Sequence, residues 1–294
     1  MKPAPFEYSA PSSLDEAVET LARHGEAAKV LAGGQSLVPM LNMRLVRPSV
    51  LVSLRRVASL DYVAVEDGCT RIGSMVRQRV VEQHPGVREA SPILAEALGL
   101  VAHPAIRNLG TIGGSVAHAD PAAELPAVLV AMDGTVTLVS TRGRRTLPAS
   151  EFFRGLMTTG AEPDELIAEL GFHRVGRAAL ASGWAVEEVS RRHGDFALAG
   201  VVVALAAESD GCIADARIVL FGVEDRPTRR PEAEAALRGT RGEPAAIAEA
   251  AALAVRDVDA LEDLHASARL RAHLAGVLVG RALERASRKV IRDG

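Results

Sequence analysis

Apolar positions in the first 175 residues follow either a helical period or the short, continuous or alternating runs of strands. The helical period predicts helices at 13–23, 76–83, 92–101 and 124–132. Apolar runs predict strands at 29–31, 50–54, 62–66, 69–74, 134–140 and 165–172. A short helix is expected to begin at Ser36, Asp67-Gly68 is typical of a hairpin turn, and residues 103–120 are expected to form a loop. This part of the chain is therefore predicted to mix helices with strands.

The pattern changes after residues 174–182, a small and basic segment that we interpret as a linker. Longer strands are predicted beyond it, at 184–190, 196–207 and 212–222, and two or three helices follow. In the last helix Leu270, Leu274, Val277 and Leu278 fall on one face. We therefore expect two domains, 1–176 and 177–294, the first divided into subdomains at about 1–57 and 58–176.

Composition narrows the class of protein. With 48% hydrophobic residues and a net charge of −3, the chain can bury a core and has no basic excess that would suit nucleic acid. Its start lacks the basic and apolar regions of a signal peptide, and its longest apolar run is too short to span a bilayer. Two cysteines, Cys69 and Cys212, exclude a disulfide framework and cannot ligate an iron–sulfur cluster unaided. A cytoplasmic protein is expected.

Two glycine-rich turns carry the candidate chemistry. The first is Ala32-Gly33-Gly34-Gln35-Ser36-Leu37, and the second is Thr111-Ile112-Gly113-Gly114-Ser115. Paired glycines permit positive φ and let backbone amides converge on an anion, beside hydroxyl donors. For either turn alone a simple tight turn is an equally good interpretation. Two such turns suit the two phosphates of a dinucleotide, although neither matches G-x-G-x-x-G or a P-loop.

The segments AGGQSLVPMLNMRLVRP and PAIRNLGTIGGSVAHADPAAELP together resemble the FAD-binding medium subunit of the molybdenum hydroxylases, a family related to xanthine dehydrogenase. The segments RRHGDFALAGV and LHASARLRAHLAGVLVGRALERA are similar to the same family. The resemblance implies an α+β fold. It comprises a two-subdomain FAD-binding domain like that of vanillyl-alcohol oxidase, followed by a smaller α+β domain with an antiparallel sheet packed on helices.

The resemblance also implies the residues that contact FAD. These are Ala32, Gly33, Gly34, Gln35, Ser36, Leu37, Thr111, Gly113, Gly114, Ser115, Ala117, His118 and Asp120. The two turns would cradle the pyrophosphate, and Asp120 would reach the ribityl region. Asp120 as a turn carboxylate before Pro121 and His118 as a loop histidine are the alternatives, and Arg107 and Asn108 would support the loop. His193 or Trp184 would shield the flavin or be ordinary core or surface residues. No catalytic residue and no metal ligand is expected in this chain.

The implied function is electron transfer within a complex. A large subunit would oxidise the substrate at a molybdenum cofactor, and a small subunit with two [2Fe–2S] clusters would relay electrons to FAD in this chain, in a dimer of heterotrimers. The terminal acceptor could be NAD, a quinone, oxygen or a carrier protein. Two alternatives are a self-contained FAD-dependent oxidase and a nucleotide-binding module without redox function. Gln35 and Ala161 depart from the family pattern, which puts a carbon monoxide substrate and cofactor contacts near Ala161 in doubt.

Overall fold

The structure, a computed structural model, describes residues 2–66, 68–175 and 181–293, and its N-terminal part begins with a small parallel sheet. The strands of this sheet are β1 (Glu7–Ser9), β3 (Val50–Ser53) and β2 (Ala28–Leu31), in that order. Helix α1 (Leu14–His24) begins as predicted, because the Ser13 hydroxyl accepts a hydrogen bond from the Glu16 amide (3.2 Å), and it ends at Gly25. Helix α2 (Leu37–Asn42) follows β2.

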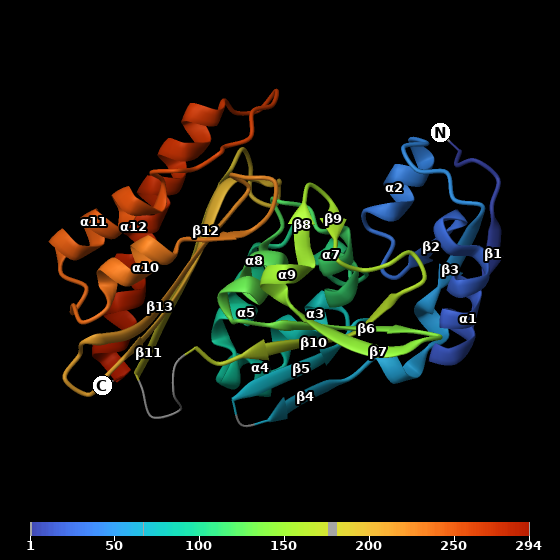
Figure 1. The fold of residues 1–294 in the computed structure, drawn as a ribbon, viewed down its shortest axis with the longest axis horizontal. Helices are drawn as coiled ribbons and strands as arrows, with labels where there is room; N and C mark the ends of the chain where they lie inside the picture. The colour runs from blue at the N-terminus through green and yellow to red at the C-terminus, as the bar shows by residue number, and fades with distance from the viewer. Residues whose placement is uncertain (1, 67, 176–180, 294) are drawn as a thin grey trace.

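A five-stranded antiparallel sheet forms the middle of the molecule (Figure 1). Its strands, in spatial order, are β4 (Val63–Glu66), β5 (Cys69–Gly73), β10 (Leu166–His173), β6 (Thr135–Ser140) and β7 (Gly143–Pro148). Strand β10 has residues in two cores. Leu166 and Ala168 pack in the core that contains α1, whereas Leu170 and Phe172 pack in the larger core with the helices of the opposite face. The predicted hairpin pairs Glu66 with Cys69, while Asp67 itself lies outside the described residues.

Short helices cover the second face of this sheet. They are α3 (Gln78–Gln83), α4 (Pro85–Ala90), α5 (Pro92–Leu100), α6 (Pro104–Arg107), α7 (Ile112–His118), α8 (Glu124–Ala131) and α9 (Ala149–Phe152), followed by the small hairpin β8 (Phe153–Gly155) and β9 (Thr158–Thr159). The prediction of a loop at 103–120 was therefore wrong, since α6 and α7 occupy most of it. Strand β1, helices α4 and α9 and the hairpin β8–β9 were not predicted.

The C-terminal part is one antiparallel sheet with helices on one face (Figure 1). Its elements are β11 (Ala181–Ser190), β12 (Ala197–Ala207), β13 (Ile213–Phe221), β14 (Thr228–Arg229), α10 (Pro231–Leu237), α11 (Pro244–Ala254) and α12 (Ala268–Asp293). Val201, Val203 and Leu220 pack with α10–α12 in one core, whereas Val202 and Phe221 join the core of the N-terminal helices. The sheet is therefore buried on both faces. Of the predicted linker, residues 176–180 lie outside the described residues.

The backbone of helix α12 lies closer to the sheet than large leucine side chains between the two would allow. A Cβ at Gly183 of β11 would stand 2.1 Å from the carbonyl oxygen of Ala286, so the two backbones nearly touch. The buried face consists of small and medium side chains, Ala275, Leu278, Val279, Ala282, Leu283, Ala286 and Val290. The predicted face was wrong in part, since Leu270 and Val277 are exposed. Phe196, which we expected at the start of a buried strand, is 70% exposed.

Helix α8 lies between the two parts of the molecule. Residues 125–131 are all buried. The helix packs against α5 and α7 of the N-terminal part and against β12, β13 and β14 of the C-terminal sheet. Because it is apolar on every side, α8 has no face suited to water. Across the described ranges, no helix is both long and apolar enough to cross a membrane.

Candidate functional site

The first glycine turn connects β2 to α2 and bends through Gly34, whose φ of +74° lies in the left-handed region. The side-chain nitrogen of Gln35 donates to the carbonyl oxygen of Gly33 (3.0 Å), which fixes the turn. Ser36 precedes the first residue of α2 but forms no cap, because its hydroxyl accepts no hydrogen bond from the helix. Residues 32–37 are all partly accessible to solvent.

Five successive backbone amides of this turn have no acceptor in the described part of the chain. Among the described residues, none accepts a hydrogen bond from the N–H groups of residues 33–37, and the Ser36 hydroxyl has no partner there either. Unpaired donors at a turn leading into a helix form a site for an anion. The turn therefore fits the phosphates of a dinucleotide, as the sequence predicts.

The second glycine turn is different, because it forms the first turn of α7 and its amides are already used. The amide of Ile112 donates to the carbonyl of Val76 (3.0 Å), and that of Gly113 donates to the carbonyl of Ser74 (2.9 Å). The Gly114 amide donates to the Thr111 hydroxyl (3.0 Å), which caps the helix. The Ser115 hydroxyl has no partner within the described part of the chain.

The two turns lie against each other. A Cβ at Gly33 would stand 2.4 Å from the carbonyl oxygen of Leu109, in the segment that leads into the second turn. A Cβ at Gly114 would stand 3.5 Å from the Cβ of Ala32 and 2.8 Å from the Thr111 hydroxyl. The structure thus brings both predicted motifs to one place, with the free amides on one side and the start of α7 on the other.

Of the remaining predicted residues, Ala117 and His118 form the end of α7 and Asp120 follows it. Ala117 is exposed, and His118 is half-buried at the end of the helix. An oxygen of the Asp120 carboxylate accepts a hydrogen bond from the Ala122 amide (2.9 Å), as expected for a turn carboxylate. Arg107 is buried and donates to Glu82 (2.9 Å), so this residue supports the local fold.

Two carboxyl groups near this site were not predicted. Burial raises the pKa of Glu124, at the start of α8, to about 8, and the negative charges of Glu188 and Asp120 add to this effect. Burial also raises the pKa of Glu188 on β11 to about 7, and its Oε2 has no partner among the described residues. The signal that could have found Glu124 is its position as the single charged residue of an otherwise apolar helix.

The two candidates for shielding a flavin lie in different places. The rings of His193 and His103 are 6.3 Å apart in an edge-to-face arrangement, and Gly194 packs directly on His103. The turn between β11 and β12 therefore rests on the N-terminal part close to α6. The ammonium group of Lys289 lies 4.0 Å from the ring centroid of Trp184, which packs at the edge of the core. This contact favours a packing role for Trp184.

Known proteins share this arrangement over nearly the whole chain. Residues 4–172 match the family model described as the FAD binding domain in molybdopterin dehydrogenase. Residues 184–286 match the model of the CO dehydrogenase flavoprotein C-terminal domain.

Individual relatives have the same extent as this chain. The 6-hydroxypseudooxynicotine dehydrogenase complex subunit alpha of Paenarthrobacter nicotinovorans is 41% identical over 97% of this chain and 96% of its own. The caffeine dehydrogenase subunit beta of Pseudomonas sp. (strain CBB1) is 39% identical, with 99% and 98% covered. A solved structure of carbon monoxide dehydrogenase from Hydrogenophaga pseudoflava superposes with a TM-score of 0.94 at 38% identity, covering 98% of this chain and 99% of that one.

Proposed function

The chain belongs to the family of FAD-binding medium subunits of molybdenum hydroxylases, and we propose that it holds FAD between its two glycine turns. It is an oxidoreductase subunit, as the motifs predicted, and the expected α+β fold of an FAD-binding domain followed by a C-terminal domain is confirmed. We further propose domain limits of 1–176 and 177–294, with subdomains at about 1–57 and 58–176.

The observation that carries the proposal is the row of free amides at residues 33–37 beside α7. In our proposal these amides and the Ser36 hydroxyl bind the pyrophosphate, and Ala32, Gly33, Gly34, Gln35 and Leu37 form the turn that presents them. Across the site, Thr111 and Gly113 hold the start of α7 in place, and Gly114 leaves room for the cofactor next to Ala32. Ser115, Ala117, His118 and Asp120 follow along the cofactor. When bound, FAD supplies the capacity to accept electrons and pass them on.

The relatives are subunits of multi-subunit complexes, and we propose the same for this chain. The partners would be a large subunit with the molybdenum cofactor and a small subunit with two [2Fe–2S] clusters, assembled as a dimer of heterotrimers in the cytoplasm. This chain would then receive electrons from the clusters and deliver them to a terminal acceptor. Within the described residues, no group of three or more His, Cys, Asp or Glu side chains is placed to hold a metal ion.

The test is a change at Gly114 with a matched change at a helical glycine elsewhere. Gly114→Val would place two methyl groups between Ala32 and Thr111, where the cofactor is proposed to lie. We expect this variant, purified with its partners, to lose the visible flavin bands and keep the iron–sulfur absorption. Gly99→Val on α5 is the control, because a Cβ there meets nothing within 4 Å.

Two results would contradict the proposal. Wild-type complex without any flavin would exclude FAD binding, and a Gly114→Val variant with normal flavin content would exclude the site. If the chain purifies alone with flavin and oxidises an organic donor with oxygen, the self-contained oxidase is the correct function instead.

A further inference from the structure

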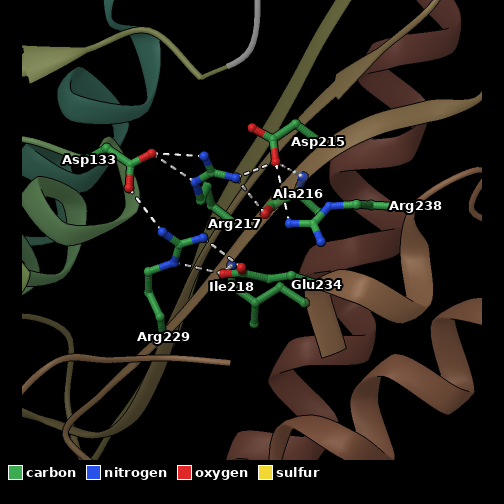
Figure 2. A network of polar contacts seen from close by, with 8 residues as sticks. All are labelled: Asp133, Asp215, Ala216, Arg217, Ile218, Arg229, Glu234 and Arg238. Atoms are coloured by element: carbon green, nitrogen blue, oxygen red, sulfur yellow. Dashed lines mark hydrogen bonds and ion pairs between the residues drawn. The ribbon is translucent and has the colours of Figure 1, made fainter. Parts of the chain in front are cut away.

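Asp133, directly after α8, connects the N-terminal part to the C-terminal sheet through two arginines (Figure 2). Its Oδ2 accepts hydrogen bonds from Nε and Nη2 of Arg217 on β13 (3.0 and 2.8 Å). Its Oδ1 accepts one from Nη1 of Arg229 on β14 (3.0 Å). One carboxylate of the FAD-binding part therefore binds both strands at the edge of the C-terminal sheet.

The position of Asp133 is unfavourable for an aspartate if α8 is considered alone. Its φ is +44°, in the left-handed region, where glycine is preferred at the end of a helix and asparagine and aspartate are tolerated. The amide of Gly134 donates to the carbonyl of Leu129 (2.8 Å), which closes the helix end in the usual way. A negative charge at the C-terminal end of a helix is also repelled by the helix dipole. The helix itself thus gives no reason for this carboxylate, whereas the two arginines do.

Both arginines are also held in place by partners other than Asp133. Arg217 also pairs with Asp215, and its side chain is only 15% exposed. Arg229 donates to both carboxylate oxygens of Glu234 (3.0 and 2.6 Å). Glu234 is 1% exposed and also accepts from the Ile218 amide (3.0 Å). An exposed ion pair contributes little when both side chains must be ordered, but here the two guanidinium groups are already ordered.

The other end of α8 is attached to the same sheet. The amide of Gly222, just after β13, donates to the carbonyl of Pro121 (2.6 Å), one residue after Asp120. Residues 119–123 join α7 to α8, so this contact lies between the proposed cofactor site and the buried helix. Both ends of α8 are therefore fixed by the C-terminal sheet, and α7 packs directly on α8.

We propose that Asp133 is a positioning residue: by clamping α8 to β13 and β14, it holds the α7 side of the cofactor site and slows release of FAD. The inference rests on the proposed function. It assigns to the C-terminal domain a part in cofactor retention that does not require it to touch the cofactor. The clamp acts through a helix that both domains bury.

The test compares Asp133→Asn with Asp164→Asn in the full chain loaded with FAD. Asparagine keeps the shape and tolerates positive φ, so the first change removes the charge and one of the two acceptor oxygens without disturbing the backbone. Asp164 pairs with Arg142 inside the N-terminal part and provides a matched loss of an ion pair away from α8. The measurements are the rate of FAD release, followed by flavin fluorescence, and hydrogen exchange of the amides of residues 125–131.

We expect Asp133→Asn to release FAD about tenfold faster, equivalent to about 1.4 kcal/mol, and to exchange the α8 amides faster. Asp164→Asn should change neither. Arg229→Gln removes the pair with Asp133 and also the pair with Glu234, so it should release FAD faster as well. In the double variant the two effects on release should be less than additive, since both changes remove the Asp133–Arg229 pair. Faster exchange in Asp133→Asn with an unchanged release rate would overturn the inference, because the clamp would then be structural only. Unchanged exchange and release would also overturn it, and a wild-type chain without FAD would contradict the proposed function itself.

Discussion

The four glycines of the two turns have different physical reasons to be glycine. Gly34 requires a positive φ, and Gly33 lies against the carbonyl of Leu109. A Cβ at Gly113 would stand 2.4 Å from the Cβ of Ser74, so this glycine is explained by packing within the protein. A Cβ at Gly114 would stand 2.8 Å from the Thr111 hydroxyl and 3.5 Å from the Cβ of Ala32, so this glycine lies where the two turns meet. The sequence motif identifies two turns that the structure brings together, but it does not distinguish glycines that could admit a ligand from glycines that admit another segment of the chain.

Glu124 allows a prediction on pH dependence. Its folded pKa of about 8 lies above the unfolded value near 4.5, so the folded state holds the proton more tightly. The stabilisation is fully present below pH 4.5 and is lost as the pH rises through 8. At pH 9, Glu124→Gln should therefore have a free energy of unfolding about 1–3 kcal/mol higher than that of the wild type, measured by urea denaturation. The difference should shrink toward pH 5. Equal stability of the two proteins at pH 9 would show that Glu124 is ionised without cost.

At the scale of elements, helix ends decided which predictions succeeded. Ser13 and Glu16 correctly predicted the start of α1, and the continuous apolar run after Glu124 correctly predicted α8. The failure at 103–120 has a physical cause, because proline and paired glycines such as Pro104, Gly113 and Gly114 are typical of loops. In the structure they occupy first turns, where a missing N–H or a glycine costs the helix little. The face of α12 was misjudged because leucine outweighs alanine in a periodicity argument, whereas close helix packing needs alanine.

The cap of α7 gives a prediction at this scale. Thr111→Val keeps the shape of the side chain but removes the acceptor for the Gly114 amide. We expect a loss of about 1–2 kcal/mol in the free energy of unfolding, measured by urea denaturation at neutral pH. Thr111→Ser keeps the hydroxyl and should lose much less. A valine variant as stable as the serine variant would mean that the cap contributes nothing.

In the whole molecule the candidate site was largely predictable, and the contacts between its parts were not. Both glycine turns were recognised from the sequence, and the structure places them side by side. The free amides of the first turn and the used amides of the second could not be foreseen. In the second turn, the amides of Ile112 and Gly113 donate to the carbonyls of Val76 and Ser74, which are far from residue 111 in sequence. The same holds for Asp133, whose arginines lie more than eighty residues away.

Glu96 joins the two domains at a second place and provides a prediction for the whole molecule. From α5 it accepts the Val186 amide of β11 (3.0 Å) and pairs with Arg285 and Lys289 of α12. Glu96→Ala would leave this amide and two cations without their carboxylate. We expect a loss of about 1–3 kcal/mol in stability, seen as a lower midpoint of one cooperative thermal transition. Two separate transitions would instead show that Glu96 is needed to couple the domains.

The C-terminal sheet, buried on both faces, also limits how such proteins can exchange parts during evolution. A module that moves between genes usually brings its own closed core. Here Val202 and Phe221 would face water without α8, although the family model for that domain starts at residue 184. A chimera that joins the C-terminal domain of one relative to the FAD-binding domain of another must therefore match α8 to the incoming sheet.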